Sequence, residues 1–290
     1  MPKAPARKAP ARKAPAKRKP RARKTSNGKS LKIFSGVAVF LLFFGAIYHY
    51  RNGIAYYLGF KSHKLPKTEA EEKRLSDVKN FQVLSKYPDK VVGFDISQYQ
   101  GEISWDEVKY VENTYKLGFV FIRATAGKNV KDACFKSNWA FAKNKKIIRG
   151  AYHYYRPNEN SLEQAENFIK TVKLQKGDLP PVLDIESLPK NQPMDSLKSG
   201  LRRWLTKVDA HYKVRPIIYS GEKYYNAFLK DEFPEYTFWI ANYNFFVEDL
   251  KDDWLFWQFT EKASVAGISG NVDINIYNGT PKQLGYLTIN

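Results

Sequence analysis

Two carboxylates, Asp184 and Glu186, stand one residue apart in PVLDIES, the stretch Pro181–Ser187. In a β-strand, residues two apart project from the same face, roughly 6.6 Å apart along the strand. Two like charges in a partly desolvated place raise one another's pKa, so one of them can stay protonated. Such a pair suits cleavage of a glycosidic bond, in which a carboxylic acid protonates the leaving oxygen. The same pair could instead be an exposed strand end that forms salt bridges.

Further acids and aromatic residues lie at the ends of other apolar runs. Asp95 ends the first run, in VVGFDISQYQG, and Asp273 opens the last one, VDINIY. Runs between them end in residues with aromatic or amide side chains: Tyr154, Tyr219, Tyr243 and Gln258. Aromatic faces pack on sugar rings, and carboxylates bind hydroxyl groups or act on the bond. Separated acids with a rim of aromatic residues therefore indicate a carbohydrate cleft.

Other kinds of catalysis find little support. Among the four histidines only His153 lies at a predicted strand end, and we expect it to be a buried polar residue rather than a base. The sequence has no GxSxG motif for a nucleophile and no HExxH motif for zinc. A single cysteine, Cys134, excludes an intramolecular disulfide and a cysteine-rich metal site. We therefore predict an enzyme that uses no metal and no cofactor.

Short β-rich runs alternate with segments of helical pattern from Val91 onward, which favours an α/β fold, a (β/α) barrel. We predict eight strands, at Val91–Ile96, Phe119–Ala124, Ile148–Tyr154, Pro181–Glu186, Pro216–Ser220, Thr237–Ala241, Leu255–Phe259 and Val272–Ile276. We predict helices at Trp105–Lys116, Cys134–Asn144, Ser161–Leu174, Met194–Tyr212 and Glu222–Leu229. Barrel enzymes carry their chemistry at the carboxyl ends of the strands, so this fold would bring the acids together.

The final third of the barrel is expected to be irregular, because only about a dozen residues separate Phe259 from Val272. A doubly wound open sheet is the alternative fold, but no Gly-rich GxGxxG loop follows the first strand. Ser161 and Gln164 have the form of a capping box at a helix start. Three aromatic residues of the later strands are expected to be core: Trp254, Phe256 and Phe259.

The net charge of +19 is concentrated ahead of the barrel. Residues 1–32 hold 13 Lys or Arg and no acid, whereas residues 91–290 hold 26 basic and 24 acidic residues. The first segment repeats Ala-Pro-Ala-Arg-Lys and has too little apolar surface to fold, so we predict a disordered basic tail. Such a tail can bind anionic lipid or nucleic-acid phosphate, and both partners stay open.

Residues 33–50 are predicted to form a single transmembrane anchor. They carry no Asp, Glu, Lys or Arg, and their 18 residues would span about 27 Å, close to the hydrocarbon thickness. A cleaved signal peptide is the alternative, but the apolar run is long for one and lacks a clear cleavage site. The basic tail predicts that residues 1–32 are cytoplasmic. Residues 51–90 would then be a juxtamembrane spacer, with a solvated helix in KTEAEEKRLSDVKNF.

Over about Val91–Asn278 the chain resembles the lysozymes of glycoside hydrolase family 25, the Chalaropsis-type muramidases. Eight motifs carry the resemblance, in the family's order: GFDISQYQG, FVFIRATAG, RGAYHYYRP, PVLDIE, PIIYSG, FWIANY, WQFT and GNVDINIY. The resemblance implies an irregular eight-stranded β/α barrel. It also implies cleavage of the β-1,4 bond between N-acetylmuramic acid and N-acetylglucosamine in peptidoglycan.

By motif position, the resemblance implies that Glu186 is the general acid and that Asp184 assists it. Asp184 would orient the 2-acetamido group of the substrate for attack on the anomeric carbon, or a carboxylate would activate water with inversion; both stay open. Asp95 and Asp273 match the other acidic positions of the family and would bind substrate or tune the charge of the pair. The expected sugar-lining residues are Tyr154, Tyr219, Tyr243 and Gln258.

Two positions depart from the family's pattern: Ala126 replaces an acid that is frequent in its ATEG stretch, and Arg123 replaces a common Lys. The leading hypothesis is a monomeric muramidase that acts on peptidoglycan glycan strands. Residues 33–50 would anchor it in the bacterial inner membrane, with the domain at 91–290 on the periplasmic or wall side. A catalytically silent glycan-binding or envelope scaffold protein is the alternative, and a nucleic-acid binder that acts through its tail is a third.

Overall fold

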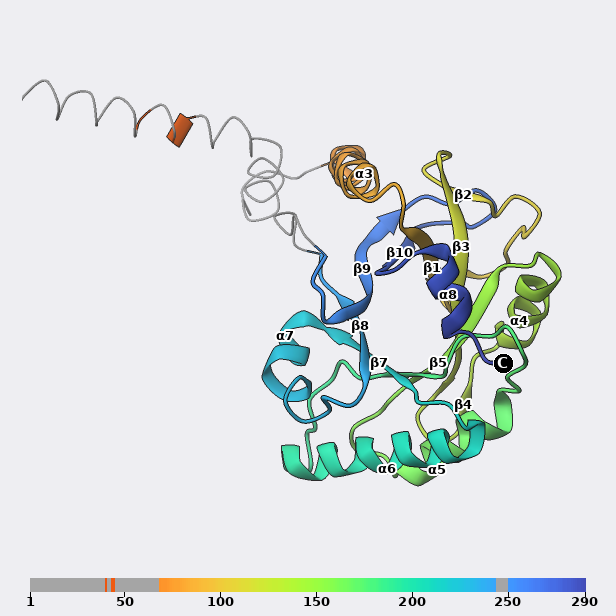
Figure 1. Ribbon diagram of the computed structural model, residues 1–290, viewed down its shortest axis with the longest axis vertical. Helices are drawn as coiled ribbons and strands as arrows, with labels where there is room; N and C mark the ends of the chain where they lie inside the picture. The colour runs from red at the N-terminus through yellow and green to blue at the C-terminus, as the bar shows by residue number, and fades with distance from the viewer. Residues whose placement is uncertain (1–39, 41–42, 45–67, 244–249) are drawn as a thin grey trace, which may run out of the picture. The chain divides into compact units, whose positions relative to one another are not determined.

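Eight strands close into a barrel in the part of the chain that the computed structural model describes, residues 40, 43–44, 68–243 and 250–290 (Figure 1). In order around the barrel they are β1 (Val91–Ile96), β3 (Tyr115–Ala126), β5 (Ile148–Tyr154), β6 (Val182–Asp184), β7 (Ile217–Gly221), β8 (Thr237–Ala241), β9 (Trp254–Ala263) and β10 (Val272–Tyr277). β1 pairs with both β3 and β10, which closes the ring. Two short strands, β2 (Tyr110–Val111) and β4 (Val130–Lys131), pair with β3. The predicted barrel and its eight strands are confirmed.

The last strand, β10, runs antiparallel to both of its neighbours, β1 and β9. The other neighbouring pairs, from β1 round to β9, are parallel. The start of β10 therefore lies at the same end of the barrel as the carboxyl ends of the parallel strands. This reversal is the irregularity that the short connection before Val272 predicted, and it brings Asp273 opposite Asp95.

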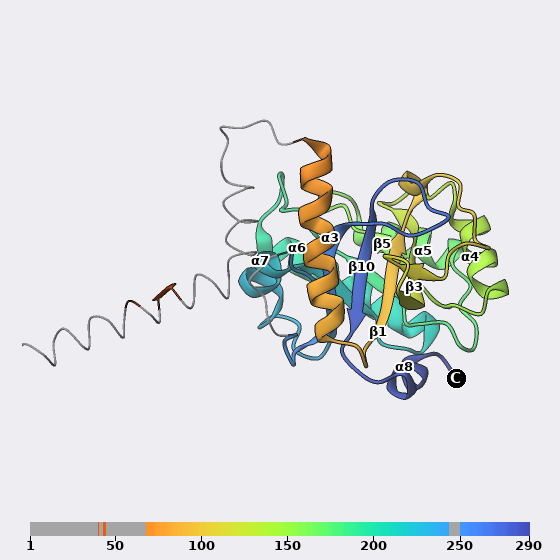
Figure 2. The same ribbon diagram turned by 90° about the horizontal axis from the view of Figure 1, so that it is seen from above.

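Helices cover the outside of the barrel. They are α4 (Phe135–Asn144), α5 (Ser161–Thr171), α6 (Met194–Tyr212) and α7 (Glu222–Tyr224) with the π-helical η2 (Tyr225–Leu229); the 3-10 turn η1 (Gln98–Gln100) follows β1. The last helix, α8 (Pro281–Leu287), lies at one end of the barrel, where Leu284 packs on the interior side chains (Figure 2). α5 and α6 lie side by side against one side of the barrel (Figure 1). The stripe Leu197, Leu201, Trp204, Leu205 and Val208 recurs at three and four residues, so α6 buries one face.

Alternation along the strands separates two apolar layers. Inside the barrel, the ring of Phe121 stacks on Trp239 with centroids 4.5 Å apart, and Phe119 and Phe256 pack beside them. Gly93 makes room for this interior, because a Cβ there would lie 2.5 Å from the Phe119 ring. The second layer fills the space between strands and helices. The three aromatic residues predicted to be core are fully buried: Trp254, Phe256 and Phe259.

A further helix, α3 (Glu69–Lys86), packs beside β9 (Figures 1 and 2). Thr68 starts it with a capping box, in which its hydroxyl accepts from the backbone N–H of Glu71. The helix that we predicted in this region is confirmed, but the prediction that it is solvated is wrong. One face is buried against the barrel, through Ser76, Lys79, Asn80 and Leu84.

The helix predicted over Trp105–Lys116 does not form. The segment contains turns, β2 and the first residues of β3. Glu112 and Asn113 have φ values of 49° and 54°, which a right-handed helix excludes, and they turn the chain from β2 into β3. Trp105 packs instead on Phe94, with ring centroids 6.3 Å apart. Tertiary packing has overridden the local helical pattern here.

The capping residue of α5 also differs from the prediction. Asn160 caps the helix, because its Oδ1 accepts from the backbone N–H groups of Leu162 (2.9 Å) and Glu163 (3.2 Å). Ser161 is the first helical residue, and the side chain of Gln164 accepts from the backbone of Arg156. The predicted capping box is therefore wrong, and the residue that caps α5 is Asn160, one position earlier.

The predicted tail, the membrane anchor and the first part of the spacer fall outside the described residues, apart from Phe40, Phe43 and Phe44. These three phenylalanines are helical, and their side chains are exposed. Within the ranges described, no helix combines the length and the apolar character needed to cross a membrane.

Candidate active site

The mouth formed by the carboxyl ends of the parallel strands gathers the four acids. Asp95 of β1 lies opposite Asp273 of β10, while Asp184 ends β6 and Glu186 follows it. Tyr154 and Tyr219 flank Asp184 on the neighbouring strands β5 and β7. The residues that the sequence singled out for catalysis and substrate binding therefore come from separate strands to one end of the barrel.

A hydrogen-bond network holds Asp95 in place. Its Oδ2 accepts from Nε2 of Gln258 (2.7 Å) and from Nδ2 of Asn275 (2.8 Å). Oε1 of Gln258 accepts from the hydroxyl groups of Tyr219 (2.7 Å) and Tyr243 (2.6 Å). Three of the four predicted sugar-lining residues thus form one network, while Tyr154 lies half-buried beside Asp184.

Burial raises the pKa of both Asp95 and Asp273. The pKa of Asp95 rises to about 7, opposed by the hydrogen bonds from Asn275, Gln258 and Asp273. The pKa of Asp273 rises to about 9, through burial first and then through the negative charge of Asp95. Asp95 is therefore the first of the pair to ionise, and Asp273 keeps the proton that it donates to Asp95.

Replacement of Asp273 by Asn is expected to stabilise the protein at alkaline pH. The folded pKa lies above the unfolded one, so the stability that this acid contributes is full below about pH 4 and is lost as the pH rises toward 9. The amide introduced by Asp273→Asn carries no charge, so the difference in melting temperature between variant and wild type should grow from pH 4 to pH 9, at roughly 2–4 °C per kcal/mol. Thermal melts across this range measure it. The exposed Asp252→Asn serves as control, and a difference that does not grow with pH would contradict the assignment.

Asp184 and Glu186 form the second pair. Burial is the largest cause that raises the pKa of each; the charge of Glu186 and the hydrogen bond between the two carboxyls raise the pKa of Asp184 further. Asp184 is 4% exposed, whereas Glu186 reaches solvent at the mouth. Oδ1 of Asp184 is buried and has no hydrogen-bond partner among the described residues. Burial therefore favours the protonated form of both carboxyls, and the hydrogen bond between them favours Asp184 as the residue that holds the shared proton.

Backbone contacts continue past the end of β6 and fix this pair. The backbone N–H of Tyr155 donates to the carbonyl of Asp184 (2.8 Å), and that of Ile185 donates to the carbonyl of Tyr219 (3.0 Å). The hydroxyl of Ser220 donates to the carbonyl of Ile185 (2.5 Å). Glu186 thus follows a segment that is tied to both neighbouring strands, although it lies outside the strand itself.

Two residues of this mouth, Tyr152 and Asn275, were not among the predicted catalytic or substrate-binding residues. Tyr152 lies among the acids, because the charges of Asp95, Asp184 and Asp273 all raise the pKa of its hydroxyl after burial does. Asn275 links Asp95 to the interior, since its Oδ1 accepts from Nε1 of Trp239 (2.7 Å). Both stand two residues from a selected residue on the same strand, and this alternation was the signal that could have found them.

Arg123, one of the two departures from the family pattern, brings positive charge to the mouth. Its Nε donates to Oδ2 of the buried Asp132 (2.9 Å), and its guanidinium lies 4.6 Å from the ring centroid of Tyr99. Its charge lowers the pKa of Asp184, against the larger effect of burial. The ring of Tyr99 is 80% exposed above it.

His153 is a buried polar residue, as predicted. Its Nδ1 shares a hydrogen bond with the hydroxyl of Thr125 (2.7 Å), its Nε2 lies 3.1 Å from Oε1 of Gln164, and its ring stacks on Trp204. Burial lowers its pKa to about 4. The side chain therefore faces the helix layer rather than the acids. Within the described ranges, no group of three His, Cys, Asp or Glu is arranged to hold a metal ion.

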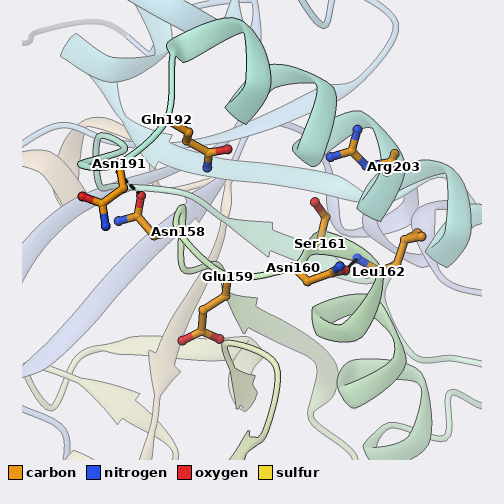
Figure 3. Close-up of a pocket in the computed structure, with 8 residues that line it drawn as sticks. All are labelled: Asn158, Glu159, Asn160, Ser161, Leu162, Asn191, Gln192 and Arg203. Carbon is orange, nitrogen blue, oxygen red and sulfur yellow. Dashed lines mark hydrogen bonds between the residues drawn. The ribbon is translucent and has the colours of Figure 1, made fainter.

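A separate polar hollow of about 350 Å³ opens between the loops before α5 and α6 (Figure 3). Its lining comprises Asn158, Glu159, Asn160, Ser161, Leu162, Asn191, Gln192 and Arg203, and none of the four acids belongs to it. Glu159 points away from Asn191 and Gln192 and accepts from the backbone N–H of Lys128 (2.7 Å) (Figure 3). The carboxylate of Glu159 thus reaches the turn that follows Ala126, the position at which the family often has an acid and this chain has Ala.

A family model and two curated proteins match the sequence of this chain. The family model for glycosyl hydrolases family 25 matches residues 94–268. Lysozyme M1 of Streptomyces globisporus is 34% identical over 209 residues, which cover 67% of this chain and 70% of that protein. The uncharacterized protein YegX of Escherichia coli K12 is 36% identical over 211 residues, 71% of this chain and 76% of its own length.

A solved structure of a lysozyme has a similar fold. The bacterial lysozyme from Streptomyces coelicolor superposes with a TM-score of 0.61 at 30% sequence identity, over 68% of this chain and 96% of that one. The family model covers more than half of the chain and contains the strands that carry Asp95, Asp184 and Gln258. The chain therefore belongs to glycosyl hydrolases family 25.

Proposed function

We propose that this protein is an N-acetylmuramidase that hydrolyses the β-1,4 bond between N-acetylmuramic acid and N-acetylglucosamine of peptidoglycan, with Glu186 as general acid. The observation that carries this proposal is the pair Asp184–Glu186 at the barrel mouth, in which both pKa values are raised by burial. A carboxyl group that stays protonated near neutral pH can protonate the leaving oxygen of a glycosidic bond.

The position of Asp184 beside Glu186 at the mouth gives this residue a definite role. The N–H of the 2-acetamido group on N-acetylmuramic acid donates a hydrogen bond to the Asp184 carboxylate. This hydrogen bond stabilises the ionised form of Asp184, so the shared proton moves to Glu186 as substrate binds. The exposed Glu186 then delivers the proton to the glycosidic oxygen, while the oriented acetamido oxygen attacks the anomeric carbon.

The closeness of the two carboxyls favours this substrate-assisted course over direct attack by water. Inverting glycosidases keep their carboxyl groups about 6.5–9.5 Å apart to hold a water molecule, and retaining enzymes with a carboxylate nucleophile keep them about 5–5.5 Å apart. Asp184 and Glu186 hydrogen-bond to each other. Neither arrangement therefore fits this pair, whereas a nucleophile supplied by the substrate needs no second carboxylate at such a distance.

The second acidic pair supplies charge at the same mouth. Asp95 ionises before Asp273, and it is 6% exposed. A buried anion stabilises the positive charge that develops at the anomeric carbon and the acetamido group. The rim residues Tyr154, Tyr219, Tyr243 and Gln258 line the sugar subsites, and the hydroxyl groups of Tyr219 and Tyr243 fix the Gln258 amide on Asp95.

The place of action proposed for this enzyme is the outer side of a bacterial inner membrane. Residues 33–50 anchor it as a single span, and the exposed Phe40, Phe43 and Phe44 present apolar rings suited to lipid. The basic residues 1–32 stay in the cytoplasm and contact anionic lipid or nucleic acid. The barrel then faces its peptidoglycan substrate as a monomer.

Product analysis tests the bond that is cleaved. Digestion of defined peptidoglycan by the full-length chain is expected to release fragments with N-acetylmuramic acid at the reducing end, which mass spectrometry after borohydride reduction identifies. Reducing-end N-acetylglucosamine would instead mean a glucosaminidase. Binding of glycan strands without any release would favour the silent scaffold, for which Ala126 is the supporting departure.

A further inference from the structure

Helix α3 lies outside the region that the family model matches, yet it reaches the rim of the active site. The family match begins at residue 94, whereas α3 spans Glu69–Lys86. Its Lys79 is 3% exposed, so the whole side chain is enclosed. A buried lysine is costly in desolvation, and proteins retain one where its ammonium has a definite partner.

One such partner is the backbone of a substrate-lining residue. Nζ of Lys79 donates to the backbone carbonyl of Tyr243 at 2.7 Å, across 164 positions of sequence. The hydroxyl of Tyr243 donates to Oε1 of Gln258 (2.6 Å), whose Nε2 donates to Asp95 (2.7 Å). Tyr243 therefore links α3 to an acid of the catalytic mouth, through its backbone carbonyl on one side and its hydroxyl and Gln258 on the other.

Tyr243 depends on such an anchor. β8 ends at Ala241, so Tyr243 lies beyond the last strand hydrogen bonds, and its side chain is 38% exposed. Its ring can pack on a sugar only if its backbone is held, because an exposed tyrosine beyond a strand otherwise samples several positions. The short contact from Lys79 supplies that restraint.

We propose that Lys79 is a positioning residue of the muramidase, which holds Tyr243 at the rim so that its ring and hydroxyl form a preorganised sugar subsite. The proposal rests on the function proposed above. It adds α3, an element outside the family match, to the machinery that binds the glycan. Burial lowers the pKa of Lys79 to about 8, opposed by the charge of Glu261, and the amine donates to the carbonyl in either protonation state.

The packing of α3 itself has other supports. Leu84 is buried in the outer core, the ring of Tyr87 meets Trp257 edge-on at 6.2 Å, and Nδ2 of Asn80 donates to Glu112 (3.2 Å). Replacement of Lys79 by Met keeps the length and apolar stem of the side chain while removing the donor. Lys79→Met should therefore leave the helix in place and remove the hydrogen bond that holds the backbone of Tyr243.

The test uses the full-length chain with Lys79→Met and, as matched control on the same helix, Lys73→Met, whose side chain is exposed and pairs with Asp77. Lys79→Met is expected to raise KM for soluble uncrosslinked peptidoglycan strands about tenfold, with kcat within about threefold of wild type. Lys73→Met should change neither, and thermal melts should show both variants folded. A Lys79→Met variant with unchanged KM would overturn the proposal.

Two further measurements separate this proposal from the function on which it rests. In a Glu186→Gln background, which needs no turnover, Lys79→Met should weaken the affinity for the same glycan strands about tenfold. In a double-mutant cycle with Tyr243→Phe, the second substitution should add little to the first, because both act on the sugar through the position of Tyr243. Equal affinities in the Glu186→Gln background, or additive effects in the cycle, would refute the role of Lys79 even if the enzyme is a muramidase.

Discussion

Replacement of Glu186 by Gln is expected to lower kcat on peptidoglycan about 10³-fold, while KM stays within about threefold of wild type. Gln keeps the size and polarity of the side chain but has no proton to give to the leaving oxygen. Loss of a contribution that exists only in the transition state lowers kcat and leaves ground-state binding intact. A reduction of this size corresponds to about 4 kcal/mol of activation free energy.

The pH profile gives the same prediction a second readout. Because the pKa of Glu186 is raised, wild-type activity should be retained below that pKa and fall as the pH rises through it. The residual activity of Glu186→Gln should lack this alkaline limb. Glu163→Gln is the matched control, since Glu163 is an exposed acid of α5 that pairs with Lys128, and it should retain wild-type rates. Wild-type rates in Glu186→Gln would exclude Glu186 as the acid.

The strands could be predicted from the sequence because each one is a dense β-branched or aromatic run bounded by turn residues. The predicted bounds of β1, β5 and β8 match the structure at both ends: Val91–Ile96, Ile148–Tyr154 and Thr237–Ala241. The order of the strands then implied that Asp95 and Asp184 share a mouth, since parallel strands end together. The position of Asp273 could not be predicted in this way, because it depends on the reversal of β10. The short connection before β10 predicted an irregular barrel but not the direction of this strand.

Two features of the fold were not predictable from local pattern. The segment Trp105–Lys116 has the apolar spacing of a helix. In the structure, turns and β2 replace the helix, and they bury Trp105 and Val111 in the core. The burial of α3 was hidden because its buried face carries polar residues, Ser76, Lys79 and Asn80. Hydropathy counts these as solvent-facing, and only their hydrogen-bond partners on distant strands reveal otherwise.

Substitution of Asp184 by Asn is expected to lower kcat about 10²–10³-fold, for a reason different from that of Glu186→Gln. The Asn carbonyl can still accept from the acetamido N–H, but it carries no negative charge to stabilise the cation that develops as the acetamido oxygen attacks. The pair also loses the group with which Glu186 shares its proton. The two variants therefore fail at different steps, one at the leaving group and the other at the nucleophile.

Aryl glycosides of N-acetylmuramic acid with leaving groups of different basicity separate the two roles. A nitrophenolate leaves without protonation, so Glu186→Gln should recover most of its lost rate on such a substrate, whereas Asp184→Asn should stay slow because the attack on the anomeric carbon is still impaired. Proton NMR of the first product should show retention of the anomeric configuration, as participation of the acetamido group requires. Inversion, or recovery of Asp184→Asn on the aryl substrate, would show that Asp184 prepares a water or serves the proton transfer. The structural reason to expect retention is the hydrogen bond between Asp184 and Glu186, a closer spacing than inverting enzymes use to hold a water between their carboxyl groups.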